Sequence, residues 1–466
     1  MSRSTRALDM LHGSLWDKLV FFALPLALTG VLQQLLNAAD VAVLGQFVGK
    51  NAMAAVGNNI SIIGLLVNLF IGLSLGANVV IAMNLGARRL ERAHEAVHTA
   101  FLLALYIGCA VAVAGELMVY PLMKMMAVPA DVWDMAETYL RIYLIGMPVM
   151  GIYNFESAIF RSRGDTRTPL VSLVVASLLN IVLNLLFVLH FGMGVDGVVW
   201  ATVIANAVSA VILFRALCRA EDVIHLELSA MHSDRKLLKE IVRIGLPAGI
   251  QGMVFSLSNL IIQSAINSLG PDAMAASAAA FTVEINVYCI VGAFGQAATT
   301  FVGQNYGAGN LERCKKVTWL AMGLNALFMG VLSIFILLFA AEMLAFFNAD
   351  PNVVELGKIR LLYVVGPEII CVVLEGLSGA MRGYGNSLIP ALLTLVGICG
   401  IRITWVYTLF VSQPTYEVLM ATYPASWLAT TVLMCFAYRF HMQHIKPRKS
   451  IRWVAKMFKR EGDGAI

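Results

Sequence analysis

Charged residues are scarce in this sequence: 13% of its 466 residues are Asp, Glu, Lys or Arg, whereas 59% are hydrophobic. A soluble domain carries roughly 25% charged residues, so this shortage excludes an ordinary water-soluble domain. The mean hydropathy of +0.79 is that of a chain solvated mainly by lipid. The net charge of +5 does not indicate nucleic-acid binding, because the basic residues gather at the ends of apolar segments.

Cofactor and enzyme signatures are also in short supply. The seven cysteines are scattered and form no CxxC pair, so they predict neither a disulfide framework nor a cysteine metal site. The phosphate-binding pattern GxxxxGK[ST] is missing, and we recognise no nucleophile and base arranged for catalysis. The polar N-terminal stretch 1–18 lacks a signal-peptide pattern, so the apolar run after it is expected to remain as a helix. We predict a protein that is not an enzyme and carries no cofactor.

Long apolar segments make up most of the chain, and each reaches the ~20 residues that an α-helix needs to cross the hydrocarbon core. They predict an all-α membrane protein with twelve transmembrane helices. The segments are 16–44, 54–82, 96–120, 135–159, 168–190, 195–217, 240–267, 275–302, 317–341, 356–379, 387–411 and 418–439.

The loops between these segments alternate in charge. Lysine and arginine are retained on the cytoplasmic side of a membrane, so the basic loops predict two cytoplasmic termini and a multi-pass location in the cell (inner) membrane. The basic loops carry Arg88, Arg89 and Arg92, then Arg161, Arg163 and Arg167, then Arg235, Lys236, Lys239 and Arg243, then Arg313, Lys315 and Lys316, and finally Arg382.

Two halves of the sequence are copies of each other. At an offset of 221 residues, GKNAMAA (49–55) matches GPDAMAA (270–276), and NLGARRLER (84–92) matches NYGAGNLER (305–313). An even number of helices per copy makes the copies parallel, so they are expected to be related by a pseudo-two-fold axis along the membrane normal, with a substrate site between them. Further matching pairs are Gly164 with Gly385, Pro169 with Pro390, Pro25 with Pro247 and Gly30 with Gly252.

The repeat predicts four regions along the chain. These are a first six-helix lobe (1–218), a cytoplasmic linker that lets the lobes move (219–239), a second six-helix lobe (240–440) and a basic tail (441–466). In the tail, apolar and basic residues fall on opposite helical faces, which favours a helix lying on an anionic leaflet; a disordered basic tail is the alternative.

Polar residues interrupt the first apolar segment. Gln33, Asn37 and Asp40 are spaced i, i+4 and i+7, which places them on one helical face. Pro25 lies about two to four turns before them. A carboxylate in hydrocarbon costs at least ~2.5 kcal/mol, so an intramembrane Asp is a functional-site hypothesis. The alternative is that Asp40 lies at the outer headgroup boundary.

Comparison of the two copies separates architecture from function. Asp40, Asn180, Asn184 and Thr202 have no polar counterparts of their kind in the second copy, where apolar or aromatic residues stand opposite them. A carboxylate, two amides and a hydroxyl offer the hard oxygen ligands that sodium accepts, with Asp40, Asn180 and Thr202 as the metal ligands, whereas Asp40 alone suffices for a proton. The plainer alternative is that the amides and the hydroxyl only connect neighbouring helices by hydrogen bonds.

The second copy has its own intramembrane charges. Glu284 is a candidate for binding a cationic substrate or a second proton, or for pairing with a base that the sequence does not identify. Arg402 has no evident partner either. A lipid-linked saccharide flippase would need arginines for pyrophosphate, so Arg402 is the residue that keeps this alternative function open.

These residues together resemble the multidrug and toxic compound extrusion (MATE) transporters over essentially all twelve segments. The resemblance is carried by the Pro25–Asp40 segment, FRSRGDTRTP (160–169), residues 283–309 and AMRGYGNSLIP (380–390). It implies cation-coupled efflux of amphipathic, often cationic, organic molecules by a V-shaped pair of lobes. Asp40 matches the family's proton or sodium site, with Asn180, Asn184 and Thr202 grouped around it, and Pro25 matches a position where the first helix bends.

The sequence also departs from its relatives. Many of them have an acid where this chain has Asn184. The amide of Asn184 therefore leaves the cation site with one negative charge fewer, which favours a proton over sodium. Relatives that couple through acids in the second lobe have them where this chain has Phe255 and Cys371. We therefore expect a monomeric proton antiporter that exports small organic cations by rocking of the lobes, with Gln33, Asn37, Asp40 and Glu284 contacting substrate and membrane lipid around it.

Overall fold

A computed structural model describes residues 8–126 and 128–446, and within these ranges the ordered segments are helices without a β-strand. Eleven helices are long and apolar enough to cross a membrane, and a bent pair, α4 (Trp133–Ile145) with α5 (Met147–Ser162), supplies a twelfth span. The prediction of twelve spans in an all-α protein is confirmed. The predicted tail helix lies in residues 447–466, which are outside the described part of the chain.

The first lobe begins with α1 (Trp16–Val43), which runs on into a π-helical segment, Leu44–Val48. The bend of 47° in the fourth span occurs at Gly146, two residues before Pro148. A proline has no backbone N–H to continue the hydrogen bonds of the preceding helix, which accounts for a break at this point. The remaining elements of this lobe are α2 (Lys50–Gly86), α3 (Leu90–Met125), α6 (Arg167–Leu185) with the π-helical segment Leu186–His190, and α7 (Val195–Cys218).

The second lobe repeats this order with more interruptions. Its spans are α8 (Arg235–Ser268), α9 (Pro271–Gly307), α10 (Leu311–Leu338), α12 (Pro351–Val364) with α13 (Ile369–Gly383), α14 (Leu388–Thr394) with α15 (Ile401–Trp405), and α16 (Tyr416–Met420) with α17 (Thr422–His444); the short α11 (Ala340–Phe347) precedes α12. Two π-helical segments, Leu395–Gly400 and Val406–Phe410, enclose α15.

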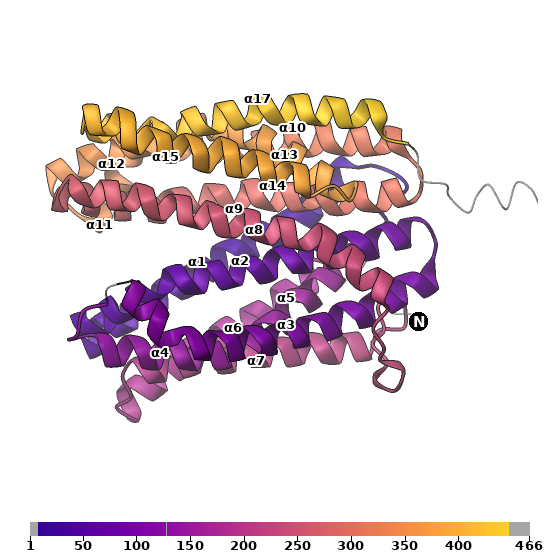
Figure 1. Cartoon of the computed structure of the whole chain (residues 1–466), viewed down its shortest axis with the longest axis horizontal. Helices are drawn as coiled ribbons and strands as arrows, with labels where there is room; N and C mark the ends of the chain where they lie inside the picture. Colours follow the sequence, from indigo (N-terminus) through magenta and orange to yellow (C-terminus); the bar gives the residue numbers. More distant parts are fainter. Residues whose placement is uncertain (1–7, 127, 447–466) are drawn as a thin grey trace, which may run out of the picture.

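The two lobes lie side by side and converge at one end of the molecule (Figure 1), where the described chain also stops after α17. This is the end that carries the basic loops. Towards the other end, the helices of the two lobes diverge in the view of Figure 1.

Glycines bring the lobes together at the converging end. A Cβ on Gly86 would lie 1.8 Å from the Gln304 carbonyl oxygen, and a Cβ on Gly307 would lie 2.0 Å from the Met83 carbonyl oxygen. With the offset of 221, Gly86 corresponds to Gly307 and Met83 to Gln304, so each contact is the repeat-related image of the other. The seam is therefore self-complementary about the pseudo-two-fold axis, as an interface between identical subunits would be.

Two further contacts join the lobes along the same interface. The Thr300 hydroxyl donates to the Asn78 amide oxygen at 3.0 Å, and both side chains are buried. Helices α2 and α8 pack most closely at Gly72 and Gly249, where an added Cβ on Gly72 would meet the Gly249 nitrogen at 2.0 Å. We define these contacts of α2 with α8 and α9 as the seam.

Replacement Gly72→Ala is expected to force α2 and α8 apart and to destabilise the protein by about 2 kcal/mol, as overpacking of a filled interface does. The midpoint of thermal unfolding of the purified protein measures this change. Gly64→Ala on the same helix is the matched control, because a Cβ there meets nothing within 4 Å. Equal midpoints for the two variants would contradict the seam as a close helix contact.

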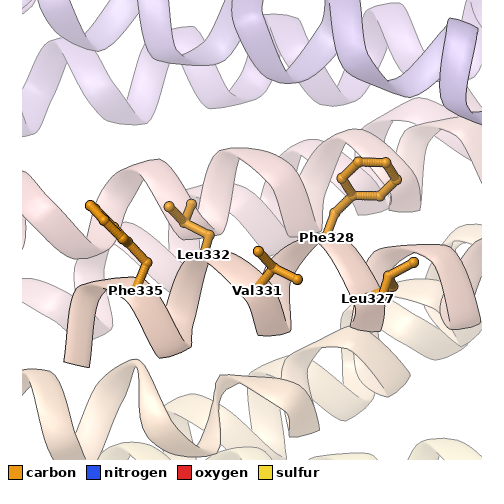
Figure 2. A pocket seen from close by; sticks show the side chains of 5 residues that line it. All are labelled: Leu327, Phe328, Val331, Leu332 and Phe335. Carbon is orange, nitrogen blue, oxygen red and sulfur yellow. The ribbon is translucent and has the colours of Figure 1, made fainter. Parts of the chain in front are cut away.

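The outer faces of the lobes are apolar. Large hydrophobic side chains such as Leu117, Leu338 and Phe436 are more than two-thirds exposed, which suits contact with lipid. A shallow groove along α10 is lined by Leu327, Phe328, Val331, Leu332 and Phe335, and Figure 2 shows these five side chains along one stretch of the helix. Because the groove offers no polar group, it gives no basis for recognition beyond hydrocarbon contact.

The linker between the lobes rests on the first lobe. Arg163, at the end of α5, forms an ion pair with Asp222, and the His98 ring accepts a hydrogen bond from the Glu227 backbone N–H at 3.2 Å. Asp234 caps the start of α8 by accepting from two backbone N–H groups, which lowers its pKa below the usual value for an aspartate. The linker is thus attached at both ends.

Candidate functional site

Asp40 is nearly buried, with 7% of its surface exposed, on the side of α1 that faces α6 and α7. The Asn184 amide nitrogen donates to Asp40 Oδ1 at 2.6 Å, and the Thr202 hydroxyl donates to Oδ2 at 3.0 Å. The carboxyl group therefore has a neutral donor on each oxygen and no basic partner among the described residues.

Asn180 completes a closed circuit of hydrogen bonds with Asp40, Asn184 and Thr202, which we call the ring. Its amide oxygen accepts from Asn184 at 3.1 Å, and its amide nitrogen donates to the Thr202 hydroxyl at 3.3 Å. Asn180 and Asn184 lie one turn apart on α6, so the i, i+4 spacing turns both amides to the same side. All four predicted cation-coupling residues, Asp40, Asn180, Asn184 and Thr202, are thus brought together.

Two details of this ring allow it to rearrange. The Thr202 hydroxyl is within reach of two acceptors, Asp40 Oδ2 and the Val198 carbonyl oxygen at 3.1 Å, but has one proton to donate. The Asn184 amide oxygen is buried and accepts no hydrogen bond within the described part of the chain. Rotation of the Asn184 amide would present this oxygen to Asp40, which is the acceptor that a protonated carboxyl needs.

Two tyrosines complete the surroundings of Asp40. Tyr139 and Tyr143, both on α4, lie close enough to interact with Asp40 electrostatically, and their rings stack with centroids 6.1 Å apart. Neither was among the site residues predicted from the sequence. Their i, i+4 spacing within a predicted span is a signal that could have been used, but the bend at Gly146 separates α4 from α5, so the orientation of α4 is not evident from the sequence.

The remaining residues of the α1 stripe differ from Asp40. Gln33 and Asn37 are exposed, one or two turns before the buried Asp40. Pro25 lies within the continuous α1 helix, and the Thr29 hydroxyl donates back to the Pro25 carbonyl oxygen at 2.8 Å. Such a bond and a proline both favour bending of a helix, so the role of Pro25 as a hinge and the substrate-binding roles of Gln33 and Asn37 stay predictions.

Glu284 lies apart from this ring, in the second lobe, and the structure supplies the base that the sequence could not identify. Arg360 on α12 donates to both carboxylate oxygens of Glu284, at 2.6 and 3.0 Å, and both side chains are buried. A bidentate pair of this kind fixes α12 against α9. Substrate binding by Glu284 stays a prediction, and it would require this pair to open.

Replacement Glu284→Gln is expected to destabilise the protein by about 3 kcal/mol or more, because Arg360 would then be buried without its counter-charge. Thermal unfolding in detergent measures the loss. The double variant Glu284→Gln with Arg360→Met removes both charges and is expected to recover most of it. A Glu284→Gln protein as stable as the wild type would show instead that the pair is not structural.

Two short sequence patterns match enzyme signatures by spacing, which the sequence analysis overlooked. HEAVH (94–98) fits the zinc-protease pattern HExxH, yet the structure contains no group of three His, Cys, Asp or Glu residues placed to hold a metal ion among the described residues. GLSLG (72–76) fits the GxSxG pattern of hydrolases, but it lies inside α2 and its glycines form the seam. The first pattern serves to hold the linker and the second to pack helices.

A multi-pass helical protein with two repeated lobes and a buried intramembrane acid that accepts from an amide and a hydroxyl is a membrane transporter in architecture. The MatE family model matches the chain twice, over residues 25–186 and 247–408, at a spacing of 222 residues. The chain therefore belongs to the MatE family, the multidrug and toxic compound extrusion transporters, whose members are membrane transporters and not enzymes.

Curated relatives are named as multidrug resistance proteins or transporters. The chain is 27% identical over 436 residues to the probable multidrug resistance protein YoeA of Bacillus subtilis, covering 92% of this chain and 94% of that protein. It is 29% identical to a probable multidrug resistance protein NorM of Thermotoga maritima, covering 83% and 84%. A further relative, 24% identical over 77% of this chain and 81% of its own length, is a FAD transporter of Shewanella oneidensis.

Solved structures share the fold. An outward-facing conformation of a MATE family multidrug resistance transporter superposes with a TM-score of 0.88 at 22% identity, covering 95% of this chain and 99% of that one. A MATE structure in a bent conformation gives a TM-score of 0.85 at 21% identity, covering 95% and 98%.

Proposed function

We propose that the protein exports small amphipathic organic cations in exchange for protons, with Asp40 as the coupling group. The observation that carries this proposal is the ring around Asp40, in which a buried carboxyl group is held by neutral hydrogen-bond donors alone. Such a group has no fixed counter-charge, so it must take its counter-ion from the transport cycle, either as a proton or as a cationic substrate.

The donors favour a proton over sodium. Both oxygens of Asp40 already accept from N–H or O–H groups, and the Asn184 amide nitrogen lies where a sodium ligand would have to present oxygen. Sodium at Asp40, Asn180 and Thr202 would have to displace these donors, because a metal ion binds lone pairs and not hydrogens. A proton on Asp40 requires only the rotation of Asn184 and the switch of Thr202 to Val198 described above.

The coupling step follows from these bonds. Neutralisation of Asp40 by an external proton weakens the bonds that hold α1 to α6 and α7, so α1 shifts and the substrate site loses its negative charge. The substrate then leaves to the outside. Proton release to the inside restores the ring, and the lobes return by rocking about the seam, with the linker 219–239 and both termini on the cytoplasmic side of the cell membrane and the monomer as the working unit.

Export of an anionic or lipid-linked substrate is the second candidate function. It is favoured by one observation, the buried Arg402 in the second lobe, which a purely cationic substrate would not use. A FAD transporter among the relatives shows that one member of the comparison set has an anionic substrate. A flippase for a lipid-linked saccharide belongs to the same candidate, since its pyrophosphate would require such a base.

The test uses purified protein in liposomes loaded with ethidium, with a pH gradient and a sodium gradient imposed in separate experiments. We expect the pH gradient alone to drive efflux. Efflux driven by the sodium gradient alone would mean that sodium, and not a proton, is the ion that binds at Asp40. Failure of both gradients to move the dye would overturn the proposal and leave the second candidate.

A further inference from the structure

Arg402 lies in the second lobe and is completely buried. It belongs to α15, a single helical turn between the π-helical segments Leu395–Gly400 and Val406–Phe410. π-Helical insertions widen a helix, cost stability and occur frequently at functional sites. A fully buried arginine between two of them therefore requires an explanation beyond packing.

The guanidinium group of Arg402 is only partly satisfied by the protein. Its Nη1 donates to the Asn259 amide oxygen at 2.8 Å and its Nε donates to the Ser426 hydroxyl at 3.2 Å, while Nη2 is buried without an acceptor within the described residues. The ring of Tyr423 lies 4.6 Å from the guanidinium carbon and that of Phe255 lies 5.3 Å from it. Each of these partners is neutral.

Arg402 thus lacks the counter-charge that the buried Arg360 and the partly buried Arg382 of this lobe possess. Arg360 forms its bidentate pair with Glu284, and Arg382 lies 3.6 Å from Glu375. The remaining ion pairs of this lobe, in the described part of the chain, join exposed lysines to exposed glutamates. An arginine stays protonated in proteins, and a buried charge is retained only where something compensates it.

The repeat places Arg402 opposite the coupling site of the first lobe. With the offset of 221, Asn180 corresponds to Ile401, which directly precedes Arg402, and Thr202 corresponds to Tyr423. In the first lobe, too, π-helical segments follow the site residues, after Asp40 on α1 and after Asn184 on α6. Each lobe therefore holds one polar site at the corresponding place, centred on an acid in the first lobe and on a base in the second.

The covering layer over Arg402 is thin on one side. Phe255 and Asn259, both on α8, are only partly buried, and the Phe255 ring stacks on Tyr288 with centroids 6.1 Å apart. Tyr288 is 37% exposed. Movement of the Phe255 and Asn259 side chains would open Arg402 towards the exposed face of α8, and the Asn259 amide oxygen now occupies the position that a ligand oxygen would take.

We propose that Arg402 is a binding site for an oxyanion group, a carboxylate or a phosphate, of the transported molecule, which would replace the Asn259 oxygen as the acceptor of Nη1. The planar guanidinium, with Nη1 and Nη2 side by side, matches the two oxygens of such a group. This inference rests on the proposed transport function for the identity of the ligand. It predicts that the two lobes recognise opposite charges, so the preferred substrates are organic molecules that carry both.

A matched pair of dyes tests the proposal by binding alone, without a gradient. A rhodamine with a free carboxylate and its methyl ester differ only in the anionic group. Fluorescence polarisation with purified protein is expected to give about tenfold or tighter binding of the carboxylate dye, since a charge-assisted pair in a buried site is worth at least that factor. Arg402→Gln is expected to abolish this preference and to leave binding of the ester unchanged.

Two variants at Asn259 keep the test valid if Arg402→Gln does not fold. Asn259→Asp places a permanent carboxylate against Arg402 Nη1 and is expected to remove the preference for the carboxylate dye. Asn259→Ala frees Nη1 and is expected to keep or increase it. An equal preference in the wild type and Asn259→Asp, or equal binding of both dyes by the wild type, would overturn the site. Failure of dye transport with an intact preference would instead count against the proposed transport function alone.

Discussion

In Asp40→Asn protein, ethidium efflux driven by a pH gradient is expected to fall to the level of liposomes without protein. The amide can still accept from Asn184 or Thr202, so the helices around it should stay in contact and the thermal unfolding midpoint should change little. It cannot exchange a proton, however, and the coupling step is lost. Efflux is measured with equal amounts of reconstituted wild type and variant.

Asp131→Asn is the matched control, because it removes one carboxylate from an exposed position of the same lobe. This variant is expected to transport at the rate of the wild type. The pH dependence of dye binding gives a second measurement: it should be present in the control and lost in Asp40→Asn. Efflux retained in Asp40→Asn at more than a small fraction of the wild-type rate would contradict the role of Asp40.

The second large effect is expected from Asn184→Asp, which introduces a carboxylate where the amide now contacts Asp40 at 2.6 Å. Two carboxylates at this distance repel each other strongly, and the hydrogen bond that Asn184 donates to Asp40 is lost. The site then offers oxygen ligands from both acids and from Asn180, which is a set that sodium accepts. Dye efflux should therefore become dependent on sodium, by tenfold or more between sodium-free and sodium-containing buffer.

Asn206→Asp is the control for this change. Asn206 lies one turn beyond Thr202 on α7 and donates to the Thr202 backbone carbonyl, without a contact to Asp40. An acid at this position adds the same charge to the lobe but no ligand to the ring. If sodium stimulated both variants equally, general charge and not the geometry at Asp40 would be responsible, and the ring would lose its significance for ion choice.

Much of the fold and the first-lobe site could be predicted from the sequence, because both depend on regular spacings. A bilayer admits helices of a narrow range of lengths, so the apolar segments determine the number of spans. The i, i+4 spacing of Asn180 and Asn184 determines that their amides point the same way, and the repeat shows that Asp40 has no acidic counterpart. Each of these inferences needs only one helix or one offset.

Contacts between helices that are distant in the sequence could not be predicted in this way. Arg360 lies 76 residues from Glu284, and its span was recognised as apolar without any indication of the direction in which its arginine points. The same holds for Asn259 and Ser426, which approach Arg402 from two different helices. Helix rotation and depth decide these pairs, and they are set by packing details such as the glycines of the seam.

The presence of Asn184 instead of an acid has an electrical consequence. In the proposed cycle Asp40 is the single ionisable group of the ring, so exchange of a monovalent organic cation for one proton would move no net charge across the membrane. The membrane potential, worth about 2.3 kcal/mol per charge and 100 mV, then neither drives nor opposes export. A substrate that carries both a cationic group and a carboxylate for the Arg402 site has no net charge. Its exchange for one proton would carry one positive charge inward. The same transporter would be electroneutral with the first kind of substrate and electrogenic with the second.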